Sequence, residues 1–443
     1  MSETEEGEAK ASPFEPRRFT RRHAGIVGVC GAGMAFDGLE LGMNGVFAAV
    51  FARDPNVAPG ELGLLISVSA LAVVLGAPVF GWLADRFGRR PALVGTLIGF
   101  GTFSLFCAAT HSMPALIIAR FLASICVGAY RPVQGAYLVD TMPSSARGSV
   151  MYWTVVLAGP GGASPMFLTR AFNVDGGFEG WRVPLIVGGV GGLLVAALTL
   201  WLLPESPKWL NSQGRRDEAI RAYGRLEGAE AAKELEGLKT AGAAVAKRAR
   251  FSALFSPEYR ARLALLVAVE FLAAWAVIFI ALQGAVFALR GYDLNRSLVF
   301  TGISMLSVPV GALLTTLFVD KIDRGTAMAS GATVFIGLAI AFLLIPGAPA
   351  ALTLATLMTM VSAMCGLGAM VYASEMFPTE LRGTATTVGH ATNGLGLAVS
   401  PLVLLPMLKG EGEMLPIAVM CATQVALIAT VLSLGRRIRR GIT

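Results

Sequence analysis

Apolar residues form runs of about 20 residues along most of this chain, and short polar turns separate one run from the next. Each run is long enough to cross the hydrocarbon core of a bilayer as a helix. The runs do not alternate in polarity as barrel strands do, and an open sheet would leave backbone groups unpaired in lipid. The pattern predicts an all-α membrane protein with twelve spans: 24–51, 61–83, 92–109, 114–139, 149–169, 183–203, 262–289, 297–319, 326–345, 351–372, 384–408 and 414–434.

The polar turns contain an internal repeat. The turn after the fourth span carries five residues that recur, identical or as Glu for Asp, 235 positions later (372 minus 137), after the tenth span. The two sets are Tyr137, Asp140, Pro143, Arg147 and Gly148, then Tyr372, Glu375, Pro378, Arg382 and Gly383. The repeat predicts two pseudo-symmetric six-helix bundles, an arrangement typical of alternating-access transporters with a site between the halves.

This repeat divides the chain into five predicted segments. They are an N-terminal tail (1–22), a first six-helix bundle (23–203), a linker with short amphipathic helices (204–260), a second bundle (261–435) and a basic tail (436–443). An even number of spans places both termini on one side. Basic residues flank the first and last spans, so we expect that side to be the cytoplasm of a bacterium, with the protein in the inner (plasma) membrane.

Composition excludes several classes. The hydrophobic share is 55%, the charged share is 15% and the net charge is +7, with the basic residues gathered beside the spans. No soluble basic domain is present to bind nucleic acid. The five cysteines are scattered without a CxxC pair, which argues against disulfides or a metal site. Without a nucleotide-binding loop or a catalytic constellation, we expect no enzyme and no cofactor, only a proton gradient as energy source. The expected partners are the bilayer and a small molecule, and we expect a monomer.

Charged turns at one end of the bundles suggest a gate. The stretch 81–91 carries Asp85, Arg89 and Arg90, and the first two have a looser echo in Asp320 and Arg324. Arginine and carboxylate side chains form directional pairs that can hold helices together in one state and release them in another. The simpler alternative is that these charges only anchor loops among lipid headgroups. The predicted cytoplasmic gate consists of Asp85, Arg89, Arg90, Asp140, Arg147, Asp320, Arg324, Glu375 and Arg382.

These turns carry a family resemblance. Residues 81–91, Gly-Trp-Leu-Ala-Asp-Arg-Phe-Gly-Arg-Arg-Pro, resemble the signature loop of the major facilitator superfamily, and the two repeated turns resemble its companion signatures. Residues 204–210, Pro-Glu-Ser-Pro-Lys-Trp-Leu, resemble a motif after span six that is shared by sugar porters, organic-ion transporters and aromatic-acid:proton symporters. The resemblance implies the major facilitator fold and transport by alternating access.

Charges inside the first span are candidates for proton coupling. Asp37 and Glu40 lie one helical turn apart near the centre of an apolar run. Two carboxylates this close in a low dielectric do not easily both stay ionised, so one is expected to bind a proton. The stretch resembles the Asp-Gly-x-Asp element of aromatic-acid:proton symporters, with Glu40 in place of the second Asp. The alternative is that either acid pairs with an arginine and packs two helices together.

The other intramembrane polar residues suggest a substrate site. Arg131 lies deep in the fourth span and cannot deprotonate, so it must meet Asp37, Glu40 or a substrate carboxylate. Arg120 stands where the superfamily often has arginine, which implies a structural role. Glu270 lies near the cytoplasmic end of its span and is expected to snorkel. The predicted substrate-binding residues are Arg131, Gln134, Asn44, Trp275, Gln283, His390 and Asn393.

Together these features predict a proton-coupled symporter of a small organic anion, specifically a carboxylate. Gly159-Pro160-Gly161-Gly162 resembles, with altered spacing, an element of drug:proton antiporters, although a proline kink with small-residue packing is the simpler interpretation. A proton-driven exporter of drugs or metabolites therefore stays an alternative, as does a transporter of a neutral polyol, a sugar or an organic cation.

Overall fold

The computed structural model describes residues 13–173, 178–237, 251–318 and 323–435 of the 443-residue chain. Most of the predicted N-terminal tail (1–12), the C-terminal tail (436–443) and Asp320 lie outside these ranges. Within them the regular structure is helical, and no strand is found. The fold class predicted from the pattern of apolar runs is therefore confirmed.

The first half of the chain forms one helical bundle. Its fourth span is broken at Ala129 into two helices, which places Tyr130 and Arg131 at the start of the second piece. The elements are α1 (Arg21–Phe51), α2 (Pro59–Phe87), α3 (Arg89–Ala109), α4 (Met113–Gly128), α5 (Tyr130–Thr141), α6 (Arg147–Phe172), the short η2 (Phe178–Trp181) and α7 (Arg182–Leu202).

The linker contributes α8 (Pro207–Ser212), α9 (Arg216–Glu227), α10 (Ala229–Gly237) and η3 (Phe251–Phe255). The second bundle follows, and its first span is also broken, at Ile278. Its elements are α11 (Arg260–Val277), α12 (Phe279–Leu289), α13 (Leu294–Phe318), α14 (Arg324–Leu344), α15 (Ala348–Glu375), α16 (Thr379–Glu411), α17 (Met414–Thr430) and the π-helical η4 (Val431–Gly435).

All twelve predicted spans coincide with helices over their described residues, although neither helix break was predicted. Among the described ranges, eleven helices or joined helix pairs are long and apolar enough to cross a membrane. The fifth span, α6, has 26 residues but is less apolar, because glycine and proline occupy its middle.

Small residues let α1 and α6 approach closely. A Cβ atom on Gly42 would lie 2.2 Å from the carbonyl oxygen of Gly162, and one on Gly161 would lie 2.1 Å from that of Ala35. The Gly-Pro-Gly-Gly element of α6 thus serves helix packing, the simpler of the two interpretations of its sequence. This contact fixes the rotation of α1, whose acids meet arginines of the fourth span.

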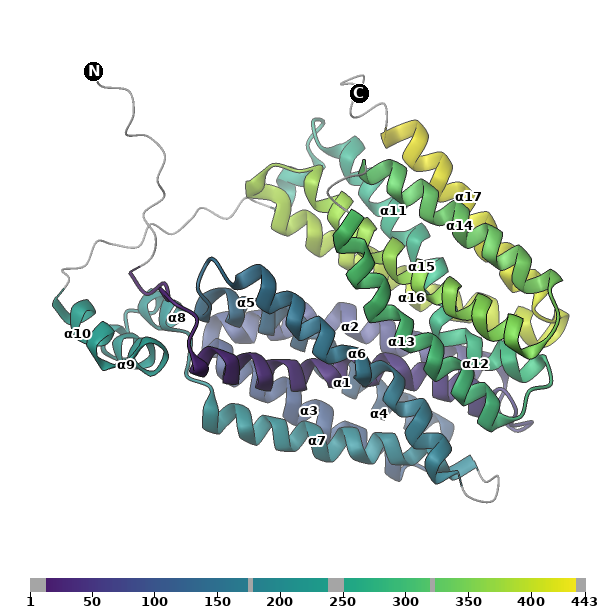
Figure 1. The fold of residues 1–443 in the computed structure, drawn as a ribbon, viewed down its shortest axis with the longest axis horizontal. Helices are drawn as coiled ribbons and strands as arrows, with labels where there is room; N and C mark the ends of the chain where they lie inside the picture. Colours follow the sequence, from purple (N-terminus) through teal and green to yellow (C-terminus); the bar gives the residue numbers. More distant parts are fainter. Residues whose placement is uncertain (1–12, 174–177, 238–250, 319–322, 436–443) are drawn as a thin grey trace.

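The two bundles form a V in Figure 1, with α8–α10 beside one end of the first bundle. We call this the linker end. At the opposite end the halves are joined: Arg53, just after α1, donates to the Tyr292 carbonyl and to the Ser297 hydroxyl at 2.7 Å each. A Cβ atom on Gly63 of α2 would lie 3.2 Å from the Pro401 carbonyl of α16. The end away from the linker is therefore closed in this conformation.

Candidate functional site

A buried ion pair joins α1 to α4. Arg120 is 1% exposed, and its guanidinium bonds both the Glu40 carboxylate and, at 2.7 Å, the Glu40 carbonyl. The Ser124 hydroxyl donates to the second carboxylate oxygen, and the Asn44 amide oxygen accepts from Arg120 at 3.3 Å. Glu40 is thus fully engaged, and the pair is built like a structural link between two helices.

A second, exposed ion pair joins α1 to α5. Arg131 contacts the Asp37 carboxylate at 2.5 Å, yet 63% of its side chain is accessible. The Asp37 side chain is 18% exposed. His390 on α16 of the second bundle is also exposed, and it lies within electrostatic range of Arg131. These three residues, Asp37, Arg131 and His390, come from both halves, and we call them the central site.

The remaining predicted substrate residues are more deeply placed. Gln134, Trp275 and Gln283 are buried, and each keeps a polar atom without a hydrogen-bond partner: Gln134 Nε2, Trp275 Nε1 and Gln283 Oε1. Asn393 is partly buried and donates to the backbone oxygen of Glu270 at 3.1 Å. Asn44 belongs to the buried pair rather than to the central site. In the part of the chain described, no three metal-ligating side chains gather into a candidate metal site.

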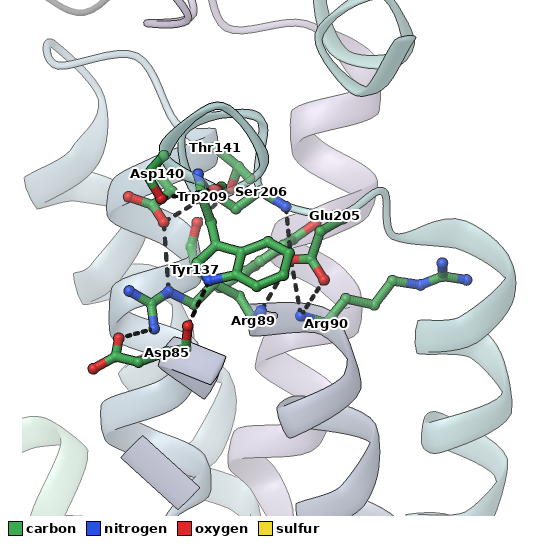
Figure 2. Close-up of polar contacts among 10 residues, drawn as sticks. Asp85, Arg89, Arg90, Tyr137, Asp140, Thr141, Glu205, Ser206 and Trp209 are labelled. Carbon is green, nitrogen blue, oxygen red and sulfur yellow. Dashed lines mark hydrogen bonds and ion pairs between the residues drawn. The ribbon is translucent and has the colours of Figure 1, made fainter. Parts of the chain in front are cut away.

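Figure 2 shows a dense polar cluster at the linker end, built around the turn between α2 and α3. Asp85 binds Arg89 at 2.6 Å, and Arg89 Nε lies 3.7 Å from the Asp140 carboxylate at the end of α5. Three of the predicted gate residues therefore meet. The contacts described for Arg89 and Asp140 are made within the first half and the start of the linker.

Glu205 is the centre of this linker-end cluster. Its carboxylate accepts backbone N–H groups of Arg89, Arg90 and Ser206 at 2.8 to 3.2 Å, at the N-terminus of α3 where a helix favours negative charge. Gly88 makes this possible. Its φ is +113°, and a Cβ atom there would lie 2.3 Å from Glu205 Oε2. Burial raises the pKa of Glu205, while the backbone donors act in the opposite direction.

The linker motif completes the cluster. The Ser206 hydroxyl donates to Asp140 at 2.9 Å, Trp209 Nε1 donates to the Asp85 carbonyl at 2.9 Å, and the Tyr137 hydroxyl donates to the Pro204 carbonyl at 2.8 Å. Sequence reasoning did not assign Glu205 or Trp209 to the gate. The motif at 204–210 was the available signal, but the sequence analysis took it only as evidence of family membership.

The N-terminal segment also joins this end. Arg147 binds Glu15 at 2.8 Å, and Lys208 lies 3.9 Å from the same carboxylate. Burial lowers the pKa of Lys208. Phe14 is fully buried in an apolar cluster with the linker, where its ring meets that of Tyr223. No sequence signal pointed to Glu15 or Phe14.

The second-half gate prediction is less fully described. Arg324 starts α14, whose first turn is capped by Asp323. Glu375 and Arg382 lie on α15 and α16, but their side chains, like Asp320, lie outside what the structure describes. The gate role of the whole set stays a prediction.

Comparisons with known proteins agree with this architecture. The family model described as Major Facilitator Superfamily matches residues 30–401. An arabinose-proton symporter of Bacillus subtilis is 27% identical over 75% of this chain and 74% of its own length. A niacin transporter of Acinetobacter baylyi is 24% identical over 87% of each chain, and a 4-hydroxybenzoate transporter of the same species is 30% identical over 44% of this chain and 42% of its own. The inward-open xylose transporter of Escherichia coli has a TM-score of 0.74 at 18% identity, covering 92% of this chain and 95% of that one.

Proposed function

Because this chain belongs to the Major Facilitator Superfamily, we propose that it is a proton-coupled symporter that carries a small organic anion, a carboxylate, by alternating access. It is a multi-pass membrane transporter, and its relatives are transporters rather than enzymes. We assign the linker end to the cytoplasm of a bacterial inner membrane, with both termini on that side, because basic residues gather there.

The observation that carries this proposal is the exposure of Arg131. An arginine in the middle of a span normally has its charge buried against an acid, as Arg120 does. Arg131 instead leaves 63% of its side chain accessible, within electrostatic range of His390 of the opposite bundle. A guanidinium presents paired N–H donors that match a carboxylate. Arg131 can therefore hold a substrate carboxylate between the halves.

The Asp37–Arg131 pair also suggests how a proton is coupled. An incoming carboxylate must share Arg131 with Asp37, and the two anions repel each other. A proton on an Asp37 oxygen removes that competing charge and releases guanidinium donors to the substrate. Proton binding and anion binding then favour each other. Asp37 fits this role better than Glu40, whose oxygens are held by Arg120 and Ser124.

Three relatives support a carboxylate as the cargo. Their names state transport of niacin, 4-hydroxybenzoate and gallate, which are aromatic carboxylic acids. In the structure the two bundles diverge toward the linker end and are joined at the other end by Arg53. The gate charges at the linker end would join the halves in the opposite state.

Uptake into proteoliposomes tests the proposal. We expect labelled 4-hydroxybenzoate or nicotinate to accumulate under an inward proton gradient, with alkalinisation of the outside. Arg131→Ala should abolish this, while Arg170→Ala, which removes an exposed arginine at the end of α6, should not. Asp37→Asn should make substrate affinity independent of pH. Carboxylate uptake without proton movement would exclude the symport mechanism, and gradient-driven efflux alone would indicate an exporter.

A sugar is the second candidate substrate. The unpaired Trp275 Nε1 and Gln283 Oε1 atoms are buried polar groups of the kind that a hydroxyl-rich ligand satisfies. An arabinose-proton symporter is among the relatives. Competition of unlabelled arabinose with labelled 4-hydroxybenzoate decides between them: displacement by the sugar, and insensitivity of sugar uptake to Arg131→Ala, would favour this candidate.

A further inference from the structure

The second bundle contains a buried carboxyl group that the proposed mechanism does not use. Glu270 lies on α11, within the candidate membrane span Arg260–Leu289, and is 4% exposed. The sequence led to the expectation that its side chain would snorkel toward the membrane surface. That expectation is wrong, because Glu270 packs inward between α11 and α16.

Two residues of α16 define its surroundings. A Cβ atom on Gly389 would lie 3.3 Å from Glu270 Oε1, so the carboxyl group occupies the space that this glycine leaves open. One turn further along, the Asn393 amide donates to the Glu270 backbone oxygen at 3.1 Å. His390, the exposed member of the central site, follows Gly389 directly. Glu270 thus packs against the same turn of α16 that carries His390 of the central site.

Among the side chains that the structure describes, few carry a charge that could balance an ionised carboxylate at Glu270. Of the helices packed against α11, α12 and α17 have no charged residue. The described titratable side chains of α15, α16 and α17 are Cys365, Tyr372, His390 and Cys421, and none of them is an arginine or lysine. On α11 itself, Arg262 is two turns away and donates to the Met376 carbonyl. Among the ion pairs of the described residues, none includes Glu270.

This isolation distinguishes Glu270 from the acids of the first bundle. Glu40 and Asp37 each have an arginine, which stabilises the charged form. Burying an unpaired carboxylate carries a large desolvation cost, whereas a neutral carboxyl group avoids most of that cost. In this conformation Glu270 is therefore suited to hold a proton, and to lose it when water or a cation reaches it.

We propose that Glu270 is a second proton-binding carboxyl group of the transport cycle, located in the second bundle behind His390. It binds a proton when α11 and α16 close around it, and it releases the proton when movement of α16 hydrates the space beside Gly389. This inference rests on the proposed proton-coupled function. The chemical-labelling experiment can be read even if the proposed substrate is wrong, because it requires no transport.

The transport experiment compares Glu270→Gln with Glu258→Gln, a matched change at an exposed glutamate just before α11. We expect Glu270→Gln to lose at least tenfold in gradient-driven accumulation of 4-hydroxybenzoate and to lose the accompanying alkalinisation. Its exchange of labelled for unlabelled substrate should continue, because exchange needs no net proton release. Glu258→Gln should behave as the unmodified protein. Normal gradient-driven accumulation by Glu270→Gln would overturn the proposal.

A chemical experiment needs neither substrate nor a folded variant. Dicyclohexylcarbodiimide adds the O–H of a protonated carboxyl group in an apolar site across one C=N bond, which gives an O-acylisourea. The acyl group then moves from that oxygen to the neighbouring nitrogen, so that a stable N-acylurea forms and no group leaves. Mass spectrometry of the full-length protein in lipid should find this adduct on Glu270 at pH 6, less of it at pH 9, and none on Glu258. Absence of the adduct at both pH values would overturn the proposal. If the unmodified protein moves no carboxylate, the proposed cargo fails while this labelling still decides the role of Glu270.

Discussion

Two arginine–carboxylate pairs connect the first span to the fourth, and they differ chiefly in burial. Arg120 and Glu40 are enclosed and share three further hydrogen bonds, whereas Arg131 is mostly accessible beside Asp37. The same chemistry therefore has two uses. An enclosed pair cannot exchange its partner without a large desolvation penalty, so it holds helices, while an accessible pair can exchange its partner for a ligand.

The strongest test of this contrast breaks the enclosed pair. Arg120→Ala leaves Glu40 buried without a cation and should lower the free energy of unfolding by about 3–5 kcal/mol. Thermal unfolding of the detergent-solubilised protein measures this. An Arg120→Leu, Glu40→Leu double variant removes both charges and should be markedly less destabilised. Equal losses in the single and double variants would contradict the assignment of Glu40 as an ionised partner.

The accessible pair should respond in binding rather than in stability. Arg131→Ala removes charge-assisted hydrogen bonds of about 1.5–3 kcal/mol to a carboxylate, a loss of roughly 10- to 100-fold in affinity. The unfolding temperature should change little, because the side chain is mostly accessible. Equilibrium binding of 4-hydroxybenzoate and a thermal scan of the same sample measure both quantities. A large stability loss with unchanged affinity would make Arg131 a structural residue.

Glu205 is a third kind of buried carboxylate, bound by backbone N–H groups rather than by an arginine side chain. A variant of Gly88 tests how much the close approach of Glu205 to this turn contributes to stability. Gly88→Ala places a side chain at φ +113° and into Glu205, so we expect a loss of about 1–3 kcal/mol. Gly81→Ala is the matched control, since a Cβ atom there meets nothing within 4 Å. Similar stability of the two variants would show that the linker motif can move away from the turn.

The pH dependence of the same residue gives a smaller effect. Burial raises the pKa of Glu205 in the folded protein. Its contribution is therefore largest below the pKa of the unfolded chain and declines as pH rises through the folded value. The stability difference between the unmodified protein and Glu205→Gln should shrink between pH 4 and pH 8. A difference that grows over this range would mean that the backbone donors outweigh burial.

An ion pair at the protein surface should have almost no effect. Arg215 and Glu218 at the start of α9 form a 2.7 Å ion pair at the protein surface. Exposed pairs are screened by water and salt, so Arg215→Ala should leave both unfolding temperature and transport unchanged. A clear change in either would mean that the linker helices contribute more than surface charge.

The sequence predicted the spans well because lipid imposes long apolar runs, and it predicted the bundles because the turns repeat. It also indicated that Arg131 would meet an acid or a ligand. It did not reveal which acid, because Asp37 and Glu40 are one turn apart and only packing decides which arginine each one meets. Glu205 was missed because its partners at Arg89 and Arg90 lie more than a hundred residues earlier. Glu270 was misjudged because its burial depends on a glycine of another helix.

The docked N-terminal segment has a consequence for biosynthesis. Arg22, at the start of α1, donates to the Arg225 carbonyl in α9 at 2.6 Å, and Phe14 packs among linker residues. The ribosome must therefore synthesise the six spans of the first bundle and more than 20 linker residues before the N-terminal segment can form these contacts with the linker. Until then, Arg147 lacks its ion pair with Glu15, and the linker end of the nascent bundle lacks the contacts of the N-terminal segment. A chain that stops after α7 should consequently insert into the membrane and yet remain susceptible to proteolysis at this end.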